Sequence, residues 1–291
     1  MVGGPTGPAG GRLTRRLVLA ALALPAAPPL LASPQGRRDG ARTLDFAKPA
    51  DNLYGLLKLM GDLSGKRTYV LQYGRIHGFA EGKLARHLLN YSGLTTREVR
   101  SDGAGGYVTR YGGWMLMRDP VTDAVIDEWL HPLTGAVVPV EHFVTTIGKQ
   151  NFTADGLKRP PGFKGDFLWF DKPFVLPWRT IGDDIWAPYE QFSVYQDSAG
   201  NARYEKAIHT YHGKLSQLAD RTASAPASIA SQSQSPYFPW MKMAAAGGHM
   251  ILHSAGRKLA GAHEIPDRVR RDVERRYPGA IDRAFDWVSD R

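Results

Sequence analysis

The sequence of 291 residues contains no cysteine. Disulfide bonds, thiol nucleophiles and cysteine-based metal sites are therefore excluded as sources of stability or chemistry. Long hydrophobic runs are also lacking. The apolar stretch Leu17–Leu24 is much shorter than the about 20 residues of a membrane-spanning helix, and Pro25 breaks any helical continuation. We expect no stable membrane span.

The common signatures of cofactor use and of nucleophilic catalysis are missing. The chain has no Gly-x-Ser-x-Gly, no phosphate-binding Gly-x-x-x-x-Gly-Lys-Ser/Thr and no zinc-binding His-Glu-x-x-His. The glycine-rich run Gly103–Gly106 lacks the spacing of a dinucleotide-binding loop, and no helix is predicted to follow it. These absences argue against nicotinamide, flavin and ATP. They predict a protein that works without a cofactor and without a metal.

Positive charge is thinly spread. The formal net charge is +9, and residues 1–40 hold five arginines and one aspartate, which leaves +5 on the remainder. Because the lysines and arginines are scattered, a nucleic-acid partner is not predicted. Aromatic residues are plentiful, with 7 Trp, 12 Tyr and 11 Phe. They suit a β-rich core, and equally a pocket for an apolar or aromatic ligand.

The N-terminal region has the pattern of an export signal. Arg15 and Arg16 precede the apolar stretch, and several prolines follow it. This order is typical of a cleavable signal of the twin-arginine type, with an uncleaved anchor as the alternative. We interpret residues 1–40 as an export signal and linker, and predict a periplasmic location for the protein. No feature of the sequence indicates an oligomeric state.

Residues 41–291 are predicted to form a single, mainly β domain. A helix is expected over 44–60 and two short helices are expected to open at Pro266 and Pro278. The strands expected from alternation are 67–79, 107–117, 167–170, 185–195 and 203–212. Sequential strands without intervening helices favour an antiparallel curled sheet or barrel of the calycin or lipocalin type. A polar connection over 145–166 and a flexible loop at about 222–235 are predicted to interrupt it.

A short repeat lies in the middle of the chain. The run 118–125 matches the run 130–137, with Pro, Thr, Ala and Val in register. Each copy predicts a Pro-x-Thr-Asp/Gly turn that leads into a strand, with positive φ at Gly135. Asp119 and His131 precede the two prolines. We interpret them as turn initiators, and a role in a site is the alternative.

Two blocks of the sequence resemble a known family. The first runs from Asp119 through Trp129 to His142, and the second is the tail 236–259. They resemble the bacterial family called domain of unknown function 1838, in which an Asp-Pro-x-Thr-Gly turn leads to a Trp, an Asn-Pro-x-Thr-Gly turn and a Val-x-His. His131 stands in place of that Asn, and Asp123 in place of the first Gly. The resemblance covers about residues 42–290. It implies one fold for this region and no established activity.

Candidate site residues follow from strand alternation, because side chains two apart on a strand share a face. Tyr73, Arg75 and His77 form one such group, and Glu205, His209 and Tyr211 form another. If both faces line the inside of a barrel, they would converge among aromatic walls, which suits general acid–base chemistry. The more polar face of a half-buried strand is usually outside, and that alternative stays open.

The predicted catalytic residues are His77, Arg110, His209 and Tyr211. The predicted substrate-binding residues are Tyr73, Tyr107, Trp129, His142, Glu190 and Trp240. Trp129 is also expected to be a buried structural residue at a strand end. His249 and His253 share a face, so a metal bound there is a further alternative, although a site needs three or four ligands.

These residues predict a cofactor-independent lyase or isomerase that acts by general acid–base chemistry on an apolar, aromatic small molecule. A His or Glu would take the proton, and a Tyr or Arg would stabilise the oxyanion. The alternatives are a non-catalytic periplasmic carrier of hydrophobic small molecules and a cell-envelope interaction protein. An enzyme needs polar groups that converge deep in the cavity, whereas a carrier has them at the rim. The positions of His77 and His209 therefore distinguish the two.

Overall fold

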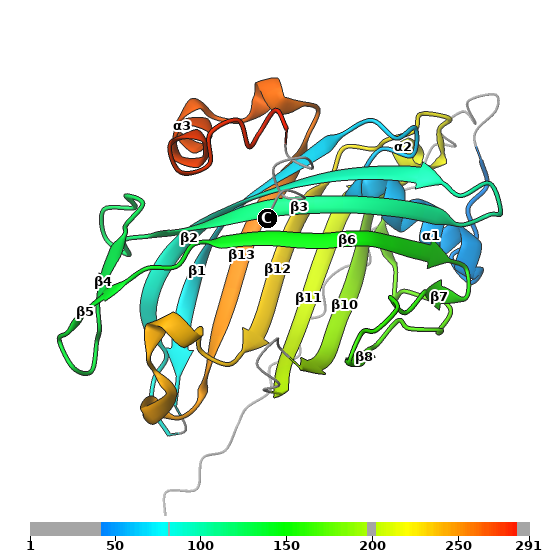
Figure 1. Cartoon of the computed structure of the whole chain (residues 1–291). Helices are drawn as coiled ribbons and strands as arrows, with labels where there is room; N and C mark the ends of the chain where they lie inside the picture. Colours follow the sequence, from blue (N-terminus) through cyan, green and yellow to red (C-terminus); the bar gives the residue numbers. More distant parts are fainter. Residues whose placement is uncertain (1–41, 81, 197–201, 284–291) are drawn as a thin grey trace, which may run out of the picture. The chain divides into compact units, whose positions relative to one another are not determined.

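The computed structural model describes residues 42–80, 82–196 and 202–283 (Figure 1). The predicted export signal and linker, residues 1–40, lie outside this part of the chain. The strands are β1 (Thr68–Phe79), β2 (Arg86–Ser101), β3 (Tyr107–Arg118), β4 (Glu128–Leu130), β5 (Val137–Pro139), β6 (Phe143–Thr153), β7 (Gly156–Leu157), β8 (Gly165–Phe167), β9 (Arg179–Ile181), β10 (Asp184–Gln196), β11 (Ala202–Lys214), β12 (Ser228–Ser235) and β13 (His249–Leu259). The helices are α1 (Pro49–Met60), α2 (Leu215–Ala219) and α3 (Asp267–Arg276), with short 3₁₀ turns η1 (Pro239–Met241), η2 (Ala244–Ala246) and η3 (Ala262–Glu264).

In the described residues, eleven of these strands form one sheet, and β4 and β5 form a separate 2-stranded ribbon. The main order is β7-β6-β3-β2-β1-β13-β12-β11-β10-β8, and its neighbours pair antiparallel. The predicted mainly β, curled antiparallel sheet is confirmed. Figure 1 shows the curl, with β6 passing in front of the strands β13 to β10. A bridge between Leu157 and Phe170 joins the two edges at one end. Between β6 and β10 no strand pairing occurs within the described ranges, and this gap is called the open seam below.

Helix α1 fills the closed end of the curl. Pro49 suits the first turn, and the leucines of the helix, such as Leu56, pack against inward side chains of β10, β11 and β12. At the other end of the helix, Lys258 of β13 donates hydrogen bonds to the carbonyls of Lys58 and Gly61 at 2.8 and 2.9 Å. These carbonyls have no partner within the helix, so the lysine terminates it.

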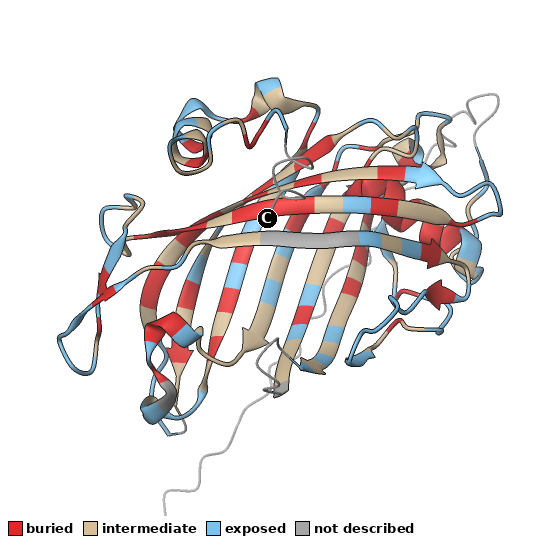
Figure 2. Ribbon diagram, in the orientation of Figure 1, coloured by how far each residue is buried: buried red, intermediate tan, exposed pale blue. Residues whose placement is uncertain are grey.

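Helix α3 covers part of the convex face. Val269 and Val273 pack there against Trp114 and other outward residues of β1, β2 and β3. An ion pair at 2.8 Å joins Asp272 of α3 to Arg118 at the end of β3, whose side chain is 1% exposed. Both faces of this part of the sheet are therefore buried, which Figure 2 shows as buried positions along β1 and β2 beneath α3.

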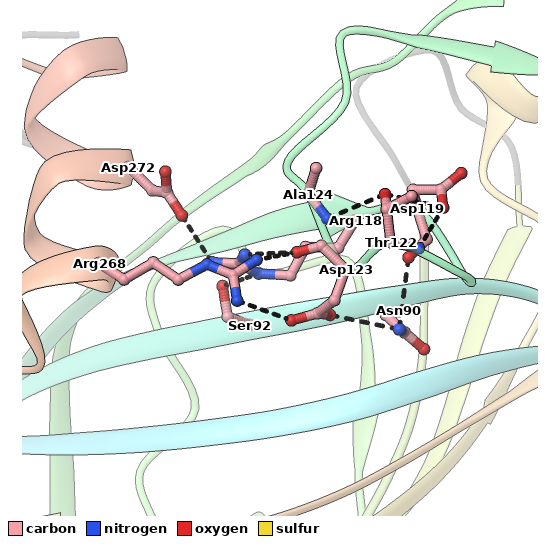
Figure 3. A network of polar contacts seen from close by, with 9 residues as sticks. All are labelled: Asn90, Ser92, Arg118, Asp119, Thr122, Asp123, Ala124, Arg268 and Asp272. Carbon is pink, nitrogen blue, oxygen red and sulfur yellow. Dashed lines mark hydrogen bonds and ion pairs between the residues drawn. The ribbon is translucent and has the colours of Figure 1, made fainter.

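Arg118 is also the centre of a polar network on the convex face (Figure 3). It donates hydrogen bonds to Ser92 Oγ at 2.9 Å and to the carbonyl of Asp123 at 3.0 Å. The carboxylate of Asp123 accepts from Asn90 at 3.2 Å and pairs with Arg268 at 3.3 Å. The network fixes α3 and the first repeat turn to the sheet.

The two turns of the internal repeat are built alike. Asp119 Oδ1 accepts hydrogen bonds from the backbone N–H groups two and three residues further on, at 2.9 and 2.7 Å. His131 Nδ1 accepts the corresponding two bonds, both at 3.2 Å. The imidazole thus takes the place of an aspartate or asparagine acceptor. Gly135 has φ 69 and its counterpart Asp123 has φ 56, so the interpretation as turn initiators agrees with the structure.

Three sequence predictions about the strands are wrong. The polar connection over 145–166 begins with strand β6, and the flexible loop over 222–235 contains β12, which is paired on both sides. The segment 167–170 holds only the end of β8, and β2 was not predicted at all. The serines of β12 that point inward face a cavity, so the strand lacks the apolar alternation used to find strands. Of the two C-terminal helices, α3 is present, and the segment after Pro278 forms turns up to residue 283.

Substitution of Trp129 measures how much the core next to the β4–β5 ribbon contributes to stability. Its side chain is 6% exposed and packs with Trp240 and Val138, as expected for a structural residue. Trp129→Ala should lower the free energy of unfolding by about 3–5 kcal/mol, because it leaves a cavity. Urea denaturation measures this. The control is Leu130→Ala, at a side chain 65% exposed, where we expect a change within about 0.5 kcal/mol. An unchanged midpoint for Trp129→Ala would contradict the burial.

Candidate functional site

A cavity of about 630 Å³ lies on the concave face of the sheet, beyond the part that α1 fills. Its volume is in the range of small-molecule sites. The apolar wall comes from side chains of β2, β3, β6, β13 and the segment before η1, namely Tyr91, Met115, Phe143, Tyr237, Phe238 and Leu252. The polar part comes mainly from β1, β11, β12 and β13, namely Gln72, Arg203, Glu205, His209, Ser231, Ser233, Ser235 and Ser254.

A chain of hydrogen bonds crosses the floor of this cavity. Gln72 Nε2 donates to Ser231 Oγ and to Ser254 Oγ, both at 3.0 Å. Ser231 Oγ also bonds to His209 Nδ1 at 2.8 Å. The chain therefore joins β11, β12, β13 and β1, and it fixes the ring of His209.

Gly74 makes this arrangement possible. A Cβ atom at this position would lie 2.5 Å from the ring of Tyr91 and 2.5 Å from the carbonyl of His253. No side chain can occupy that space, so the Tyr91 ring lies over β1 at Gly74, which pairs with Tyr91 on one side and with Ser254 on the other. We expect any residue other than glycine here to displace the ring.

A second group of polar residues faces the same side of the sheet. Strand register places them on inward positions of β2, β3, β10 and β11, and each lies within electrostatic reach of others of the group. The residues, called the inner polar cluster below, are Arg97, Tyr111, Tyr189, Glu205, His209 and Tyr211. Of these, Glu205 and His209 line the cavity. The others continue from it along the same faces of the strands: Arg97 and Tyr111 follow the lining residues Thr95 and Gly113 by two positions in register, and Tyr189 and Tyr211 belong to the core around α1.

The functional atoms of the inner polar cluster have no protein partner in the described ranges. This holds for the guanidinium of Arg97, the three tyrosine hydroxyls, the carboxylate of Glu205 and Nε2 of His209. None of them is a fully enclosed atom, so each contacts open space. Polar groups removed from bulk water are normally hydrogen-bonded, because an unmet bond costs about 1–3 kcal/mol. Such a concentration of unmet groups indicates a place for a ligand or ordered water.

Burial shifts the acid–base properties of the cluster. Desolvation, together with the positive charge of Arg97, lowers the pKa of His209 to about 4, so its imidazole is neutral at pH 7. Desolvation raises the pKa of Glu205, which makes its carboxylate a stronger base than an exposed one. The same cause raises the pKa of Tyr111, Tyr189 and Tyr211. The tyrosines therefore stay protonated and act as hydrogen-bond donors.

Loss of His209 should change the acid stability of the protein. Its pKa of about 4 in the folded state lies below the ordinary 6.5. Between these two values the unfolded chain binds the proton more readily, so the free energy of unfolding falls as the pH falls. We expect wild type to lose up to about 3 kcal/mol in this window, and His209→Gln to lose correspondingly less.

Urea denaturation at steps from pH 7 to pH 4 measures this dependence. His249→Gln is the control for loss of an imidazole, since its ring lies against Phe79 on the other face. That variant should keep the wild-type pH dependence. If His209→Gln loses stability on acidification as steeply as wild type does, His209 is not the buried neutral group described above.

Of the predicted catalytic residues, the structure brings only His209 and Tyr211 together. His77 lies on the convex face, where it stacks between His87 and His253 with both ring centroids at 5.2 Å. Arg110 is exposed and follows the outward alternation of β3, since its neighbour Tyr111 points inward. The prediction that these four residues share one pocket is therefore wrong. The reason is the assignment of strand faces: His77 on β1 and Arg110 on β3 lie on the convex face, away from the cavity.

The predicted substrate-binding residues are also divided. Tyr73 is 46% exposed on the convex face, and Glu190 lies on the opposite face of β10 from Tyr189. Trp129 and Trp240 are buried in the core beside the cavity without lining it. His142 accepts a hydrogen bond from the N–H of Met117 at 3.0 Å and lies 3.6 Å from Asp127. Tyr107 faces the concave side but packs against the α1 core.

Four members of the inner polar cluster were not among the predicted catalytic or substrate-binding residues: Arg97, Tyr111, Tyr189 and Glu205, although Glu205 belonged to one of the candidate groups. Glu205 shares a strand face with His209 and Tyr211 in the sequence, and that spacing was the available signal. Tyr111 is adjacent to Arg110, so choosing the opposite face of β3 would have found it. Arg97 gave no signal, because β2 is buried on both faces and shows no simple alternation.

The described residues were also compared with the requirements of a metal site and of a membrane-spanning helix. Among residues 42–80, 82–196 and 202–283, no three or more His, Asp or Glu side chains are grouped so that they could hold a metal ion. His249 and His253 instead stack on Phe79 and His77. The same ranges contain no helix with the length and apolar character required to cross a bilayer.

The fold and the cavity define a curled, mainly β protein with a hollow on the concave face of its sheet. Residues 65–284 match the family described as "Protein of unknown function (DUF1838)", and the chain belongs to this family. The resemblance carried by the two sequence blocks is thus confirmed. No curated protein matches the chain.

Proposed function

We propose that the protein is a cofactor-independent enzyme, a lyase or isomerase, that uses general acid–base chemistry on a small molecule with an apolar, aromatic body. One observation carries the proposal. The inner polar cluster presents acids, a base and a cation without protein partners beside a cavity with an aromatic wall. Groups with shifted pKa values in a cleft are typical of catalytic sites.

The chemistry that fits is removal of a proton from a carbon next to a carbonyl group. The Glu205 carboxylate takes the proton, and the electron pair of the C–H bond moves toward the carbonyl oxygen. The hydroxyl of Tyr211 and Nε2–H of His209, in the tautomer with Nδ1 accepting from Ser231, donate to the oxyanion. Return of the proton to another carbon gives an isomer, and loss of a leaving group gives a lyase product.

Deuterium incorporation tests this proposal without a known substrate. A small-molecule extract of the producing organism is incubated with the protein in D₂O and analysed by mass spectrometry. We expect a compound to gain deuterium or to be converted by wild type, and not by Glu205→Gln. Glu190→Gln is the matched control, because Glu190 faces away from the cavity. Identical spectra for wild type and Glu205→Gln would contradict the proposal.

A carrier of hydrophobic small molecules is the second candidate. The aromatic and aliphatic wall of the cavity, with Phe143, Phe238 and Leu252, favours it. A carrier would retain a compound through native mass spectrometry without changing it, and Glu205→Gln would retain it equally. An enzyme would show conversion that depends on Glu205. The two outcomes separate the candidates.

We also propose export by the twin-arginine route to the periplasm, supported by Arg15 and Arg16 before a short apolar stretch. Replacing both arginines by lysine should leave the precursor in the cytoplasm, because paired lysines are a poor substitute in such signals. Cell fractionation with an antibody to the protein measures the distribution. Replacement of Arg37 and Arg38 by lysine is the control and should not alter it. Normal delivery of the Arg15/Arg16 variant would contradict this route.

A further inference from the structure

Arg97 is a cation without a counter-ion on the concave face. Its guanidinium carbon lies 5.4 Å from the ring centroid of Tyr111, and it forms no ion pair or hydrogen bond with any described residue. Arg118 on the convex face is different, because Asp272 lies 2.8 Å from it. A half-buried charge is costly unless something pairs with it. Nothing in the described protein pairs with Arg97, and its surroundings therefore suit an anion.

The neighbours of Arg97 are hydrogen-bond donors. The tyrosines at 111, 189 and 211 lie within reach of its charge, and all three have a pKa raised by burial, so they stay protonated. The guanidinium can only donate hydrogen bonds, and the three protonated hydroxyls are available as donors beside it. The Glu205 carboxylate lies on the same face and interacts with Tyr111, but it forms no ion pair with Arg97. A ligand that satisfies this group has to bring acceptor atoms and negative charge.

The cavity wall defines the rest of the ligand. Two members of the inner polar cluster, Glu205 and His209, line the cavity, which also borders Gln72, Phe143, Tyr237 and Phe238. A ligand with its charged end at Arg97 would place its body against these rings. Flat aromatic groups pack favourably there, by offset or edge contacts.

We propose that the ligand is a monoanionic aromatic carboxylate, whose carboxylate binds Arg97 with help from Tyr111 and Tyr211 and whose ring system lies along the aromatic wall. The guanidinium provides two parallel N–H donors, which match the two oxygens of a carboxylate. This inference rests on the proposed function for the location of the site. It concerns equilibrium binding, so it stands or falls separately from turnover.

Two matched probes test it: 2-naphthoate and the neutral 2-naphthylmethanol, which share the same ring system. Binding to the full-length protein is measured by isothermal titration calorimetry at low and high salt. We expect 2-naphthoate to bind about tenfold more tightly or better, since hydrogen bonds to a charged partner are the stronger ones. The preference should shrink as salt rises.

Substitutions at Arg97 test whether its charge is responsible for the preference for 2-naphthoate. Arg97→Gln should abolish the preference and leave the affinity for 2-naphthylmethanol nearly unchanged. Arg110→Gln on the convex face is the matched control and should bind both probes like wild type. Arg97→Lys should keep part of the preference, because it keeps the charge without the planar donor pair. Circular dichroism establishes that each variant is folded. If Arg97→Gln does not fold, the preference for 2-naphthoate is compared between wild type and Arg97→Lys.

Several results would overturn the inference. These are equal affinity of wild type for both probes, a preference that survives in Arg97→Gln, and no binding of either probe. If wild type and both Arg97 variants bind the two probes with equal affinity, the site does not select an anion. The proposed acid–base chemistry of Glu205 would be unaffected by that result. Loss of deuterium incorporation in Glu205→Gln would still support that site. Failure of the two proposals is thus distinguishable.

Discussion

Glu205→Gln is expected to stop turnover and, at neutral pH, to make the protein more stable. The variant removes the proposed base, and loss of a general base typically costs about 10²–10⁴-fold in rate. The stability gain has a separate origin. Burial raises the pKa of Glu205 in the folded state, so ionising it is harder there than in the unfolded chain. A neutral amide of the same shape avoids that penalty.

The sign of the pH dependence follows from the same shift. Below the ordinary pKa of the carboxyl group it is protonated in both states, and wild type and Glu205→Gln should then be equally stable. As the pH rises through the raised pKa, the folded state of wild type holds the proton longer, so the free energy of unfolding of wild type falls. Thermal unfolding at pH 4 and at pH 8 measures the difference, which should appear only at pH 8.

Glu190→Gln is the matched control for both readouts, since this glutamate faces outward on the neighbouring strand. It should change neither turnover nor the pH dependence of stability. A Glu205→Gln variant less stable than wild type at pH 8 would mean that the carboxylate has a stabilising partner. The description of Glu205 as an unpaired base would then be wrong.

Arg118→Leu is expected to lower the free energy of unfolding by about 3–5 kcal/mol, the usual cost of removing one partner of a buried ion pair. Arg118 is 1% exposed, and its partner Asp272 is 18% exposed at the side chain. Without the arginine, Asp272 loses its counter-ion, and Ser92 and the carbonyl of Asp123 lose a donor. Helix α3 should detach first, because this pair joins it to the sheet.

Guanidinium denaturation monitored by fluorescence and by backbone hydrogen exchange in α3 measures this effect. Arg268→Leu is the control, since its ion pair with Asp123 is at the surface, with a side chain 54% exposed, and should contribute about 1 kcal/mol or less. The double variant Arg118→Leu with Asp272→Leu should recover much of the loss, because it leaves no unpaired charge. A loss below about 1 kcal/mol in Arg118→Leu would show that apolar packing alone holds α3.

The curled sheet itself could be predicted, since β1, β3, β10 and β11 follow the alternation seen in the sequence. β2 and β12 could not. β2 has buried positions on both faces, so its pattern resembles no single periodicity. β12 carries Ser231 and Ser233 where a core strand would carry apolar residues, because it faces the cavity. A composition rich in serine therefore concealed a strand in the middle of the sheet.

The candidate site could be predicted only on β11, where Glu205, His209 and Tyr211 share the inward face. On β1 the usual rule that polar residues lie outside did not predict which face of the strand points into the curl. There Leu71 points outward and is buried by packing in the α3 cluster, while Gln72 points inward to the cavity. The face of a strand that meets the core depends on what covers it, and that information lies in α3, far away in the sequence.

The cavity borders both strands of the open seam. In a closed barrel, exchange waits for a loop at the mouth to move, and such gating often limits the rate. Here Phe143 of β6 and Tyr195 of β10 border the cavity from opposite lips, and no strand pairing joins the two strands in the described ranges. Passage between them breaks no backbone hydrogen bond of the sheet. A guest that used this route would therefore exchange without separating any paired strands of the described sheet.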